Sequence, residues 1–216
     1  MFKSFFQQPH LQGKELWISL ALYITGMIAI GMGAVLTVNS HAGAGGYDAL
    51  TFVLSDRWNM PVSYSIYLIA VISVLLAAVI RRKFPRVTTF ITAFLLGGAV
   101  DFFRVSLAPI QGKDIFSTLA ILALGLLLIG FGVASYLLSK FPANPIDDFV
   151  LAIHEKNIPL QYAKLAFDIP CFVLAYLLGG KIGWGSIVIT LVLGPIIQLW
   201  SGLLSKILSQ YAMARN

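Results

Sequence analysis

The sequence predicts an all-α membrane protein with six transmembrane helices, arranged as two inverted three-helix repeats that each carry a short re-entrant half-helix. Three observations lead to this fold class. Of the 216 residues, 58% are hydrophobic and only 11% are charged, whereas a soluble domain carries roughly 25% charged residues. Apolar runs recur along the whole chain, and the second half repeats the order of features of the first. We expect a single membrane domain over residues 1–216.

The spanning helices follow from the lengths of the apolar runs, because a helix needs about 20 mostly apolar residues to cross a bilayer. Six runs qualify, at about 15–38, 62–81, 87–108, 115–138, 161–179 and 184–206. The loop RRKFPR, residues 81–86, holds four basic residues, and Lys3, Lys140, Lys156 and Arg215 fall on the same predicted side. Short basic loops stay in the cytoplasm, so we expect a multi-pass protein with both termini cytoplasmic.

The internal repeat appears when GMGAVLTVNSHAGAGGYDAL, from Gly31, is aligned with GFGVASYLLSKFPANPIDDF, from Gly130. NMPVSY then meets NIPLQY after a slip of one residue. Repeat one covers about 15–108 and repeat two about 115–206. Three spans per unit invert the second unit, which is a common plan of secondary transporters. The alternative is a duplication that left a compact bundle without a pathway. The two Gly-x-Gly pairs are expected at close helix contacts.

Each long loop carries a short apolar segment preceded by helix-start signals. The segment from Pro145 to Glu155 would form a helix about 16 Å long, which covers half of a hydrocarbon core of about 30 Å. Asn144 suits the N-cap, Pro145 the first helical position and Asp147 the third. The matching positions of repeat one are Gly45, Gly46 and Asp48. We expect two re-entrant half-helices whose N-termini converge; an amphipathic helix lying flat at the interface is the alternative.

Five polar residues near these segments are the candidate solute- or ion-binding residues: Asp48, Asn144, Asp147, Asp148 and Asp168. An ionisable residue inside a membrane indicates a functional site by default, and an acidic lining would attract a cation, a proton or an amine-bearing solute. For Asp48 and Asp147 the alternative is a purely structural role at the helix N-terminus. Asp148 has no acidic counterpart in repeat one, where Ala49 stands.

Two further acidic residues have local partners of opposite charge. Asp168 lies four residues after Lys164, so the two share a helix face and pairing is the alternative to a role in a pathway. Asp101 and Arg104, three residues apart, are expected to pair with each other near the outer surface.

Motifs of catalysis and cofactor binding are lacking in the sequence. There is no nucleophile with a base, no phosphate loop and no HExxH, and the single Cys171 excludes a Cys/His metal motif. We therefore expect no enzyme, cofactor, metal or nucleic-acid partner. The expected function is a membrane transporter or channel-like protein for a small solute or ion, with its site at the repeat interface. The alternatives are a non-transporting membrane partner or regulator of another membrane complex and, third, an intramembrane enzyme. A homodimer or a membrane partner is left open beside the lipid bilayer.

The stretches GMGAVLTVNSHAGAGGYDALTFVLSD and GWGSIVITLVLGPIIQLW resemble the YczE/YyaS/YitT family of bacterial integral membrane proteins. The shared features are a Gly-x-Gly helix end, a small-residue loop before an aromatic-Asp step, and a late Gly-Trp-Gly…Gly-Pro segment. Here the aromatic-Asp step is Tyr47-Asp48, and Ser186 stands where Thr is common. The resemblance covers about Gly26 to Gly202. It implies a location in the bacterial cytoplasmic (inner) membrane and supplies neither a substrate nor catalytic residues.

Overall fold

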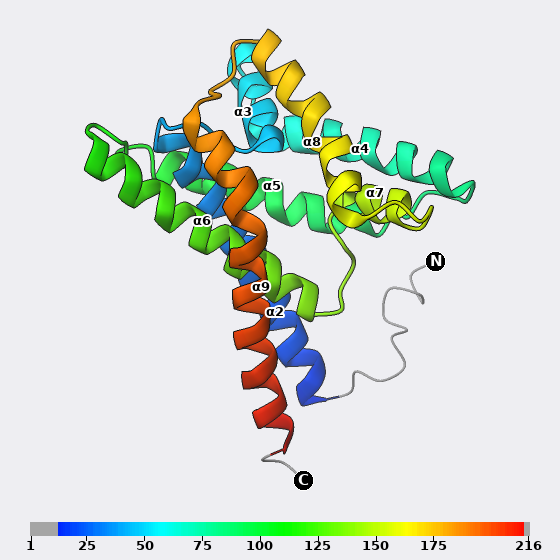
Figure 1. Ribbon diagram of the computed structural model, residues 1–216. Coiled ribbons are helices and arrows are strands. Elements are labelled where there is room, and N and C mark those ends of the chain that lie inside the picture. The colour runs from blue at the N-terminus through cyan, green and yellow to red at the C-terminus, as the bar shows by residue number, and fades with distance from the viewer. Residues whose placement is uncertain (1–12, 214–216) are drawn as a thin grey trace.

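The computed structural model describes residues 13–213, which form eight helices (Figure 1). Their bounds are α2 Lys14–Asn39, α3 Gly46–Trp58, α4 Val62–Arg81, α5 Thr89–Ser106, α6 Ile115–Leu138, α7 Pro145–His154, α8 Leu160–Leu177 and α9 Trp184–Met213. Five of these, α2, α4, α5, α6 and α9, are long and apolar enough to span a membrane. The sixth predicted span, 161–179, forms α8, which has 18 residues, includes Lys164 and Asp168, and is not one of the five. The predictions for the two termini concern residues outside the described range.

The two short helices form where the sequence predicts them. They have 13 residues in α3 and 10 in α7, or about 20 Å and 15 Å at 1.5 Å per residue, so neither can cross a membrane core. Seven consecutive residues of α3, from Ala49 to Ser55, are buried. In α3 this stretch has no exposed polar face, which an amphipathic helix at the interface would have.

Close contact between α2 and α6 forms the centre of the molecule, and it depends on glycines. A Cβ on Gly33 would lie 2.7 Å from the carbonyl oxygen of Gly125, and one on Gly26 would lie 2.8 Å from that of Gly132. The pairing runs in opposite directions along the two helices, so they are antiparallel. In each Gly-x-Gly pair the other glycine faces a third helix: Gly31 meets Ala99 of α5, and Gly130 meets Ile196 of α9. The expected close contacts at these glycines are confirmed.

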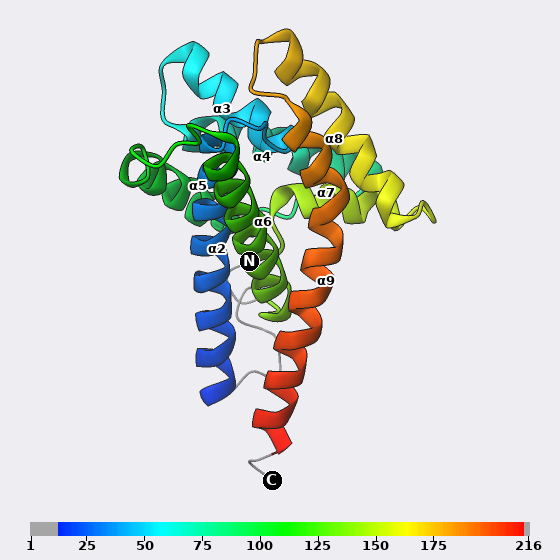
Figure 2. The same ribbon diagram turned by 60° about the vertical axis from the view of Figure 1, so that its left-hand side comes forward.

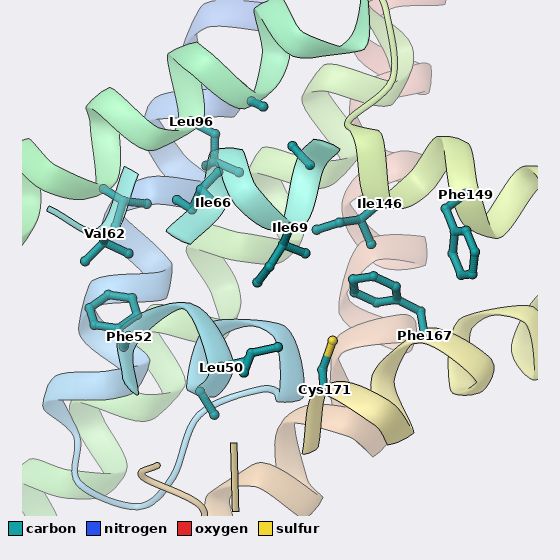
Figure 3. Close-up of a cluster of buried hydrophobic side chains, with 14 of the residues drawn as sticks. Leu50, Phe52, Val62, Ile66, Ile69, Leu96, Ile146, Phe149, Phe167 and Cys171 are labelled. Carbon is teal, nitrogen blue, oxygen red and sulfur yellow. The ribbon is translucent and has the colours of Figure 1, made fainter. Parts of the chain in front are cut away.

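The remaining helices form two groups, of which only the first packs extensively on this pair. α5 packs against α2, and α9 packs against α6 (Figure 2). The short helices α3 and α7 both pack against α4 and α8, and their apolar side chains form one cluster with those helices and α5 (Figure 3). The cluster includes Leu50, Phe52, Ile66, Ile146, Phe149 and Phe167. Both short helices are therefore held inside the protein by longer ones.

Candidate functional site

The first turns of α3 and α7 carry equivalent carboxylates. Asp48 is the third residue of α3 and Asp147 the third of α7. Asn144 is the N-cap of α7, as predicted, and its Oδ1 accepts a hydrogen bond of 3.4 Å from the backbone N–H of Ile146. In α3 the N-cap is Gly45, which forms no side-chain cap. A carboxylate in the first turn complements the positive end of the helix dipole, so both aspartates stabilise their own helices whatever else they do.

The helix α8 lies beside both of these first turns. A Cβ on Gly46, the first residue of α3, would lie 3.0 Å from the carbonyl oxygen of Asp168. The ring of Phe167 contacts one ring from each short helix, with centroids 6.3 Å from Tyr47 and 5.7 Å from Phe149. The N-terminal ends of α3 and α7 thus meet the same short stretch of α8, although they are about 100 residues apart in the chain.

Four charged groups gather at this stretch, and we call Asp48, Asp147, Lys164 and Asp168 the acidic cluster. Lys164 Nζ lies 3.2 Å from Asp168 Oδ1, which confirms the predicted i,i+4 pair. Asp48 and Asp147 both interact electrostatically with Lys164 and with Asp168. The hydroxyl of Tyr136, from α6, donates a hydrogen bond to Asp147 Oδ2. Three carboxylates and one ammonium leave a formal charge of −2, so the cluster suits a small positive group.

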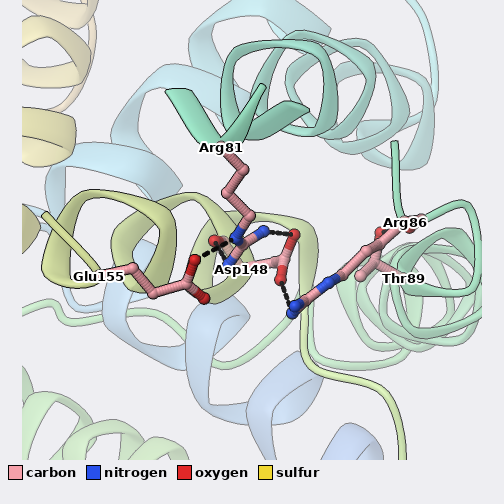
Figure 4. Close-up of polar contacts among 5 residues, drawn as sticks. All are labelled: Arg81, Arg86, Thr89, Asp148 and Glu155. Atoms are coloured by element: carbon pink, nitrogen blue, oxygen red, sulfur yellow. Dashed lines mark hydrogen bonds and ion pairs between the residues drawn. The ribbon is translucent and has the colours of Figure 1, made fainter. Parts of the chain in front are cut away.

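Asp148 takes no part in the acidic cluster and instead binds two arginines on the other side of α7 (Figure 4). Arg81 Nη1 lies 2.7 Å from Asp148 Oδ2, and Arg86 Nη1 lies 2.9 Å from Oδ1. Arg81 also donates to the carbonyl oxygen of Asp148 at 3.0 Å and, through Nε, to Glu155 Oε2 at 2.9 Å. We call Arg81, Arg86, Asp148 and Glu155 the arginine cluster.

The members of the arginine cluster differ in solvent exposure. The side chains of Arg81 and Asp148 are 5% and 3% exposed, while those of Arg86 and Glu155 are 55% and 49% exposed. The hydrogen bond from Arg81, together with the nearby guanidinium charges, holds the pKa of Glu155 below its ordinary value of 4.5. A buried pair of this kind is stable only while both charges are present, because a single buried charge has lost its hydration without compensation.

At the opposite end of α4, a cavity of about 310 Å³ opens between α3 and the segment that follows α8, residues 178–181. Ala44, Ala49 and Phe52 line its apolar part, and Asp56 and Lys181 line its polar part.

Arg104 lies at this end of the molecule and corrects one prediction. Its Nη2 pairs with Asp56 at 2.5 Å, instead of with Asp101. Asp101 accepts from the backbone N–H of Ser63, at the start of α4, at 3.3 Å.

Comparison with known proteins connects this architecture to a family. Residues 17–202 match the model of a family of unknown function, DUF6198. The chain belongs to this family. It is 31% identical over 187 residues to the uncharacterized protein YyaS of Bacillus subtilis, covering 85% of this chain and 92% of the relative. It is 27% identical over 205 residues to the uncharacterized membrane protein YczE of the same organism, with 94% of each chain covered. No solved structure matches.

The predicted resemblance to YczE and YyaS is thereby confirmed, and this DUF6198 protein is a multi-pass membrane protein. The DUF6198 match extends from Trp17 in α2 to Gly202 in α9. It therefore includes both short helices, the acidic cluster and the arginine cluster.

The arginine cluster of this DUF6198 protein was missed by the sequence reasoning, which read RRKFPR only as an orientation signal. A usable indication was present in the repeat. Asp148 is an extra acid in repeat two, because Ala49 stands opposite it, and the arginines are extra bases in repeat one, because LGGKIG stands opposite the loop. Two unmatched charges of opposite sign, one in each half, are candidates for pairing with each other.

Proposed function

We propose that this protein is a membrane transporter for a small monovalent cation, proton included, with the acidic cluster as its binding site. The proposal assigns no enzymatic activity to the chain. The observation that carries it is the contact of the N-terminal parts of both short helices with the stretch of α8 that bears the ion pair of Lys164 and Asp168. The five predicted site residues divide accordingly: Asp48, Asp147 and Asp168 bind the cation, Asn144 caps α7, and Asp148 belongs to the arginine cluster.

The packing of the helices supports an inverted repeat. α2 and α6 pack antiparallel, and each carries the last helix of its own unit, α5 or α9. Each short helix packs against a long helix of its own unit and one of the other unit: α3 against α4 and α8, and α7 against α8 and α4. A twofold axis in the membrane plane would exchange these contacts pairwise, which is the arrangement of inverted-repeat transporters.

The short helices are proposed to be re-entrant. Each follows a spanning helix and precedes a long helix that begins where the short helix ends. Irregular backbone at membrane depth is tolerated only when it is buried in protein or lines a wet cavity, and the backbone leading into α3, from Ala42 to Ala44, is buried. Their N-terminal ends would then lie at mid-depth, where transporters of this plan hold their solute.

The orientation is proposed from the basic residues, with the RRKFPR loop in the cytoplasm of a bacterial cell and the protein in the cytoplasmic membrane. The arginine cluster then faces the cytoplasm and the cavity faces outward. Lys156 follows α7 on the cytoplasmic side in agreement with this placement.

Proteoliposome flux tests the proposed function. Protons, followed with an internal pH dye, and radiolabelled methylammonium are the two probes. We expect uptake by the wild type and by Glu15→Gln, an exposed carboxylate outside the cluster, and loss of uptake in Asp48→Asn and Asp147→Asn protein that remains monodisperse. Absence of flux of both probes in the wild type refutes small-cation transport. Co-purification of a membrane complex without flux would support the non-transporting partner instead.

A further inference from the structure

The ends of α4 and α8 have the same backbone geometry, which fixes how the two repeats correspond. Arg82 and Gly179 both follow their helices with positive φ, 55° and 80°. The closing hydrogen bonds match one to one: Arg82 to Val79 and Lys83 to Ala78 in repeat one, Gly179 to Tyr176 and Gly180 to Ala175 in repeat two. This is the Schellman pattern of helix ends. The residue before each left-handed position is Arg81, the last residue of α4, and Leu178, the C-cap of α8.

The short helices correspond through their first-turn carboxylates. With Asp48 opposite Asp147, Ala49 stands opposite Asp148 and Asp56 stands opposite Glu155. α7 packs against α4 and α3 packs against α8. The contact of Arg81 with Asp148 and Glu155 in one half therefore has its counterpart in the set Leu178, Ala49 and Asp56 in the other half.

These two equivalent places are occupied differently. In the first, the guanidinium of Arg81 fills the space between α4 and α7 and is bound on three sides by Asp148 and Glu155. In the second, Leu178, Ala49 and Asp56 all line the cavity of about 310 Å³. α4 has 20 residues, or about 30 Å of helix, and separates the closed place at its C-terminal end from the open one near its start.

The cavity extends along α3 to the residues just before that helix, and the acidic cluster does not line it. Its lining extends from Asp56 and Arg57, in the last turn of α3, to Ala44, two residues before α3 begins. Asp48 lies in the first turn of the same helix. The exposed basic residues Arg57 and Lys181 stand at the outer end of the cavity. Dissolved salt there screens their repulsion of a cation at distances beyond about 8 Å.

We propose that this cavity is the access site through which the cation reaches the acidic cluster, and that Arg81 is the plug of the equivalent access site on the RRKFPR face. The inference rests on the proposed function and adds to it the two access sites and the group that closes one of them. The structure is then the form that is open at the α3–α8 face and closed at the α4–α7 face. Release on the second face requires Arg81 to leave Asp148.

Thiol labelling with a membrane-impermeant maleimide, applied from each side of the membrane, tests the assignment in a Cys171→Ala background. Val53 lines the cavity, and its repeat counterpart, Ala152, is fully buried between α7 and its neighbours. We expect Val53→Cys to react from the α3–α8 face and Ala152→Cys to be protected from both faces. Because a minor state is populated at roughly 0.1–10%, protection should slow labelling about tenfold or more. Equal reactivity of the two cysteines would overturn the proposal.

Reciprocal exchange of the lining residues tests the plug. Arg81→Leu with Asp148→Ala gives the α4–α7 face the residues of the open face, and should raise labelling of Ala152→Cys to the rate of Val53→Cys. Leu178→Arg with Ala49→Asp should protect Val53→Cys. Continued protection of Ala152→Cys in the first double variant would show that Arg81 is not the plug. If that variant does not fold, the second double variant decides, and unchanged labelling of Val53→Cys there overturns the proposal.

Labelling does not depend on flux, so the two proposals fail separately. The expected labelling pattern without flux of protons or methylammonium would leave the access sites in place and refute the solute class. Flux that is lost in Asp48→Asn, together with equal labelling on both faces, would refute the plug and leave the transport proposal standing.

Discussion

Replacing Arg81 with Leu should destabilise the protein more than replacing its partner Asp148 with Ala. In Arg81→Leu the carboxylate of Asp148, 3% exposed, keeps only Arg86, whose own side chain is 55% exposed. Removing one partner of a buried ion pair costs roughly 3–5 kcal/mol, and the remaining contact at 2.9 Å places the expected cost near the lower limit, about 3 kcal/mol. At about 2–4 °C per kcal/mol for a chain of this size, the melting temperature should fall by roughly 6–12 °C.

In Asp148→Ala the buried charge that is left behind is the guanidinium of Arg81. Arg81 keeps its hydrogen bond to Glu155 and the one to the backbone carbonyl of residue 148, which the substitution does not remove. Its charge therefore stays paired, and we expect a loss of about 1.5 kcal/mol, the lower end of the range of roughly 1.5–3 kcal/mol for a hydrogen bond to a charged group. The double variant contains no buried unpaired charge and should be more stable than Arg81→Leu alone.

Thermal unfolding in detergent, followed by tryptophan fluorescence and by size-exclusion chromatography of heated samples, measures all three variants. Arg82→Leu is the matched control, because Arg82 is the next residue in the chain and is exposed. A surface substitution of this kind should change stability by no more than about 0.5 kcal/mol. An Arg81→Leu variant that melts no lower than Asp148→Ala, or a double variant that melts as low as Arg81→Leu, would refute this order of stabilities.

Two other predictions concern pH and helix packing. The pKa of Glu155 lies below 4.5 in the folded protein, so the contribution of its carboxylate to the free energy of unfolding is fully present above pH 4.5 and is lost as the pH falls through the lowered pKa. The melting-temperature difference between wild type and Glu155→Gln should therefore shrink as the pH falls over that range. A difference that stays constant would contradict this prediction. Gly33→Ala would place a Cβ 2.7 Å from the Gly125 carbonyl oxygen and should cost about 1–3 kcal/mol. Gly194→Ala, with no described atom within 4 Å of its Cβ, should not destabilise; equal melting temperatures of the two would disprove the glycine contact.

The helices could be predicted because their determinants are local. Runs of apolar residues located α2, α4, α5, α6 and α9 to within a few residues. The predicted span 87–108 is shortened to Thr89–Ser106 at both ends. The Asn-Pro step and the Gly-Gly step located α7 and α3, because these residues satisfy or tolerate the free backbone N–H groups of a helix start.

The partners of the charged residues could be predicted only where both lie on one helix. Lys164 and Asp168, four residues apart, pair as expected. Asp101 and Arg104 have an equally suitable spacing but do not pair with each other, because Arg104 reaches Asp56 at the end of α3. Spacing along a helix brings two side chains to one face, but it carries no information about a competing charge on a neighbouring helix. The ion pair between Arg81 and Asp148, 67 residues apart, is of this non-local kind.

The two halves of the molecule differ at the helices that close each unit, and the difference bears on the proposal that the α3–α8 face is the open one. α5 packs against α4, and Gly97 of α5 lies where a Cβ would be 2.8 Å from the Tyr67 ring. Its counterpart in α9, Gly194, has open space, and α9 has no comparable packing against α8 within residues 13–213. Only 6% of the most apolar stretch of α9 is buried, compared with 33% in α5. The segment that follows α8, residues 178–181, lines the cavity. Within the described residues, α4 packs against α3, α5 and α7, whereas α8 packs against α3 and α7 without a comparable third helix, so movement of α8 breaks fewer contacts. Under the proposed transport cycle, opening of the α4–α7 face would require Arg81 to leave Asp148 and Glu155, the ion pairs that join the end of α4 to α7.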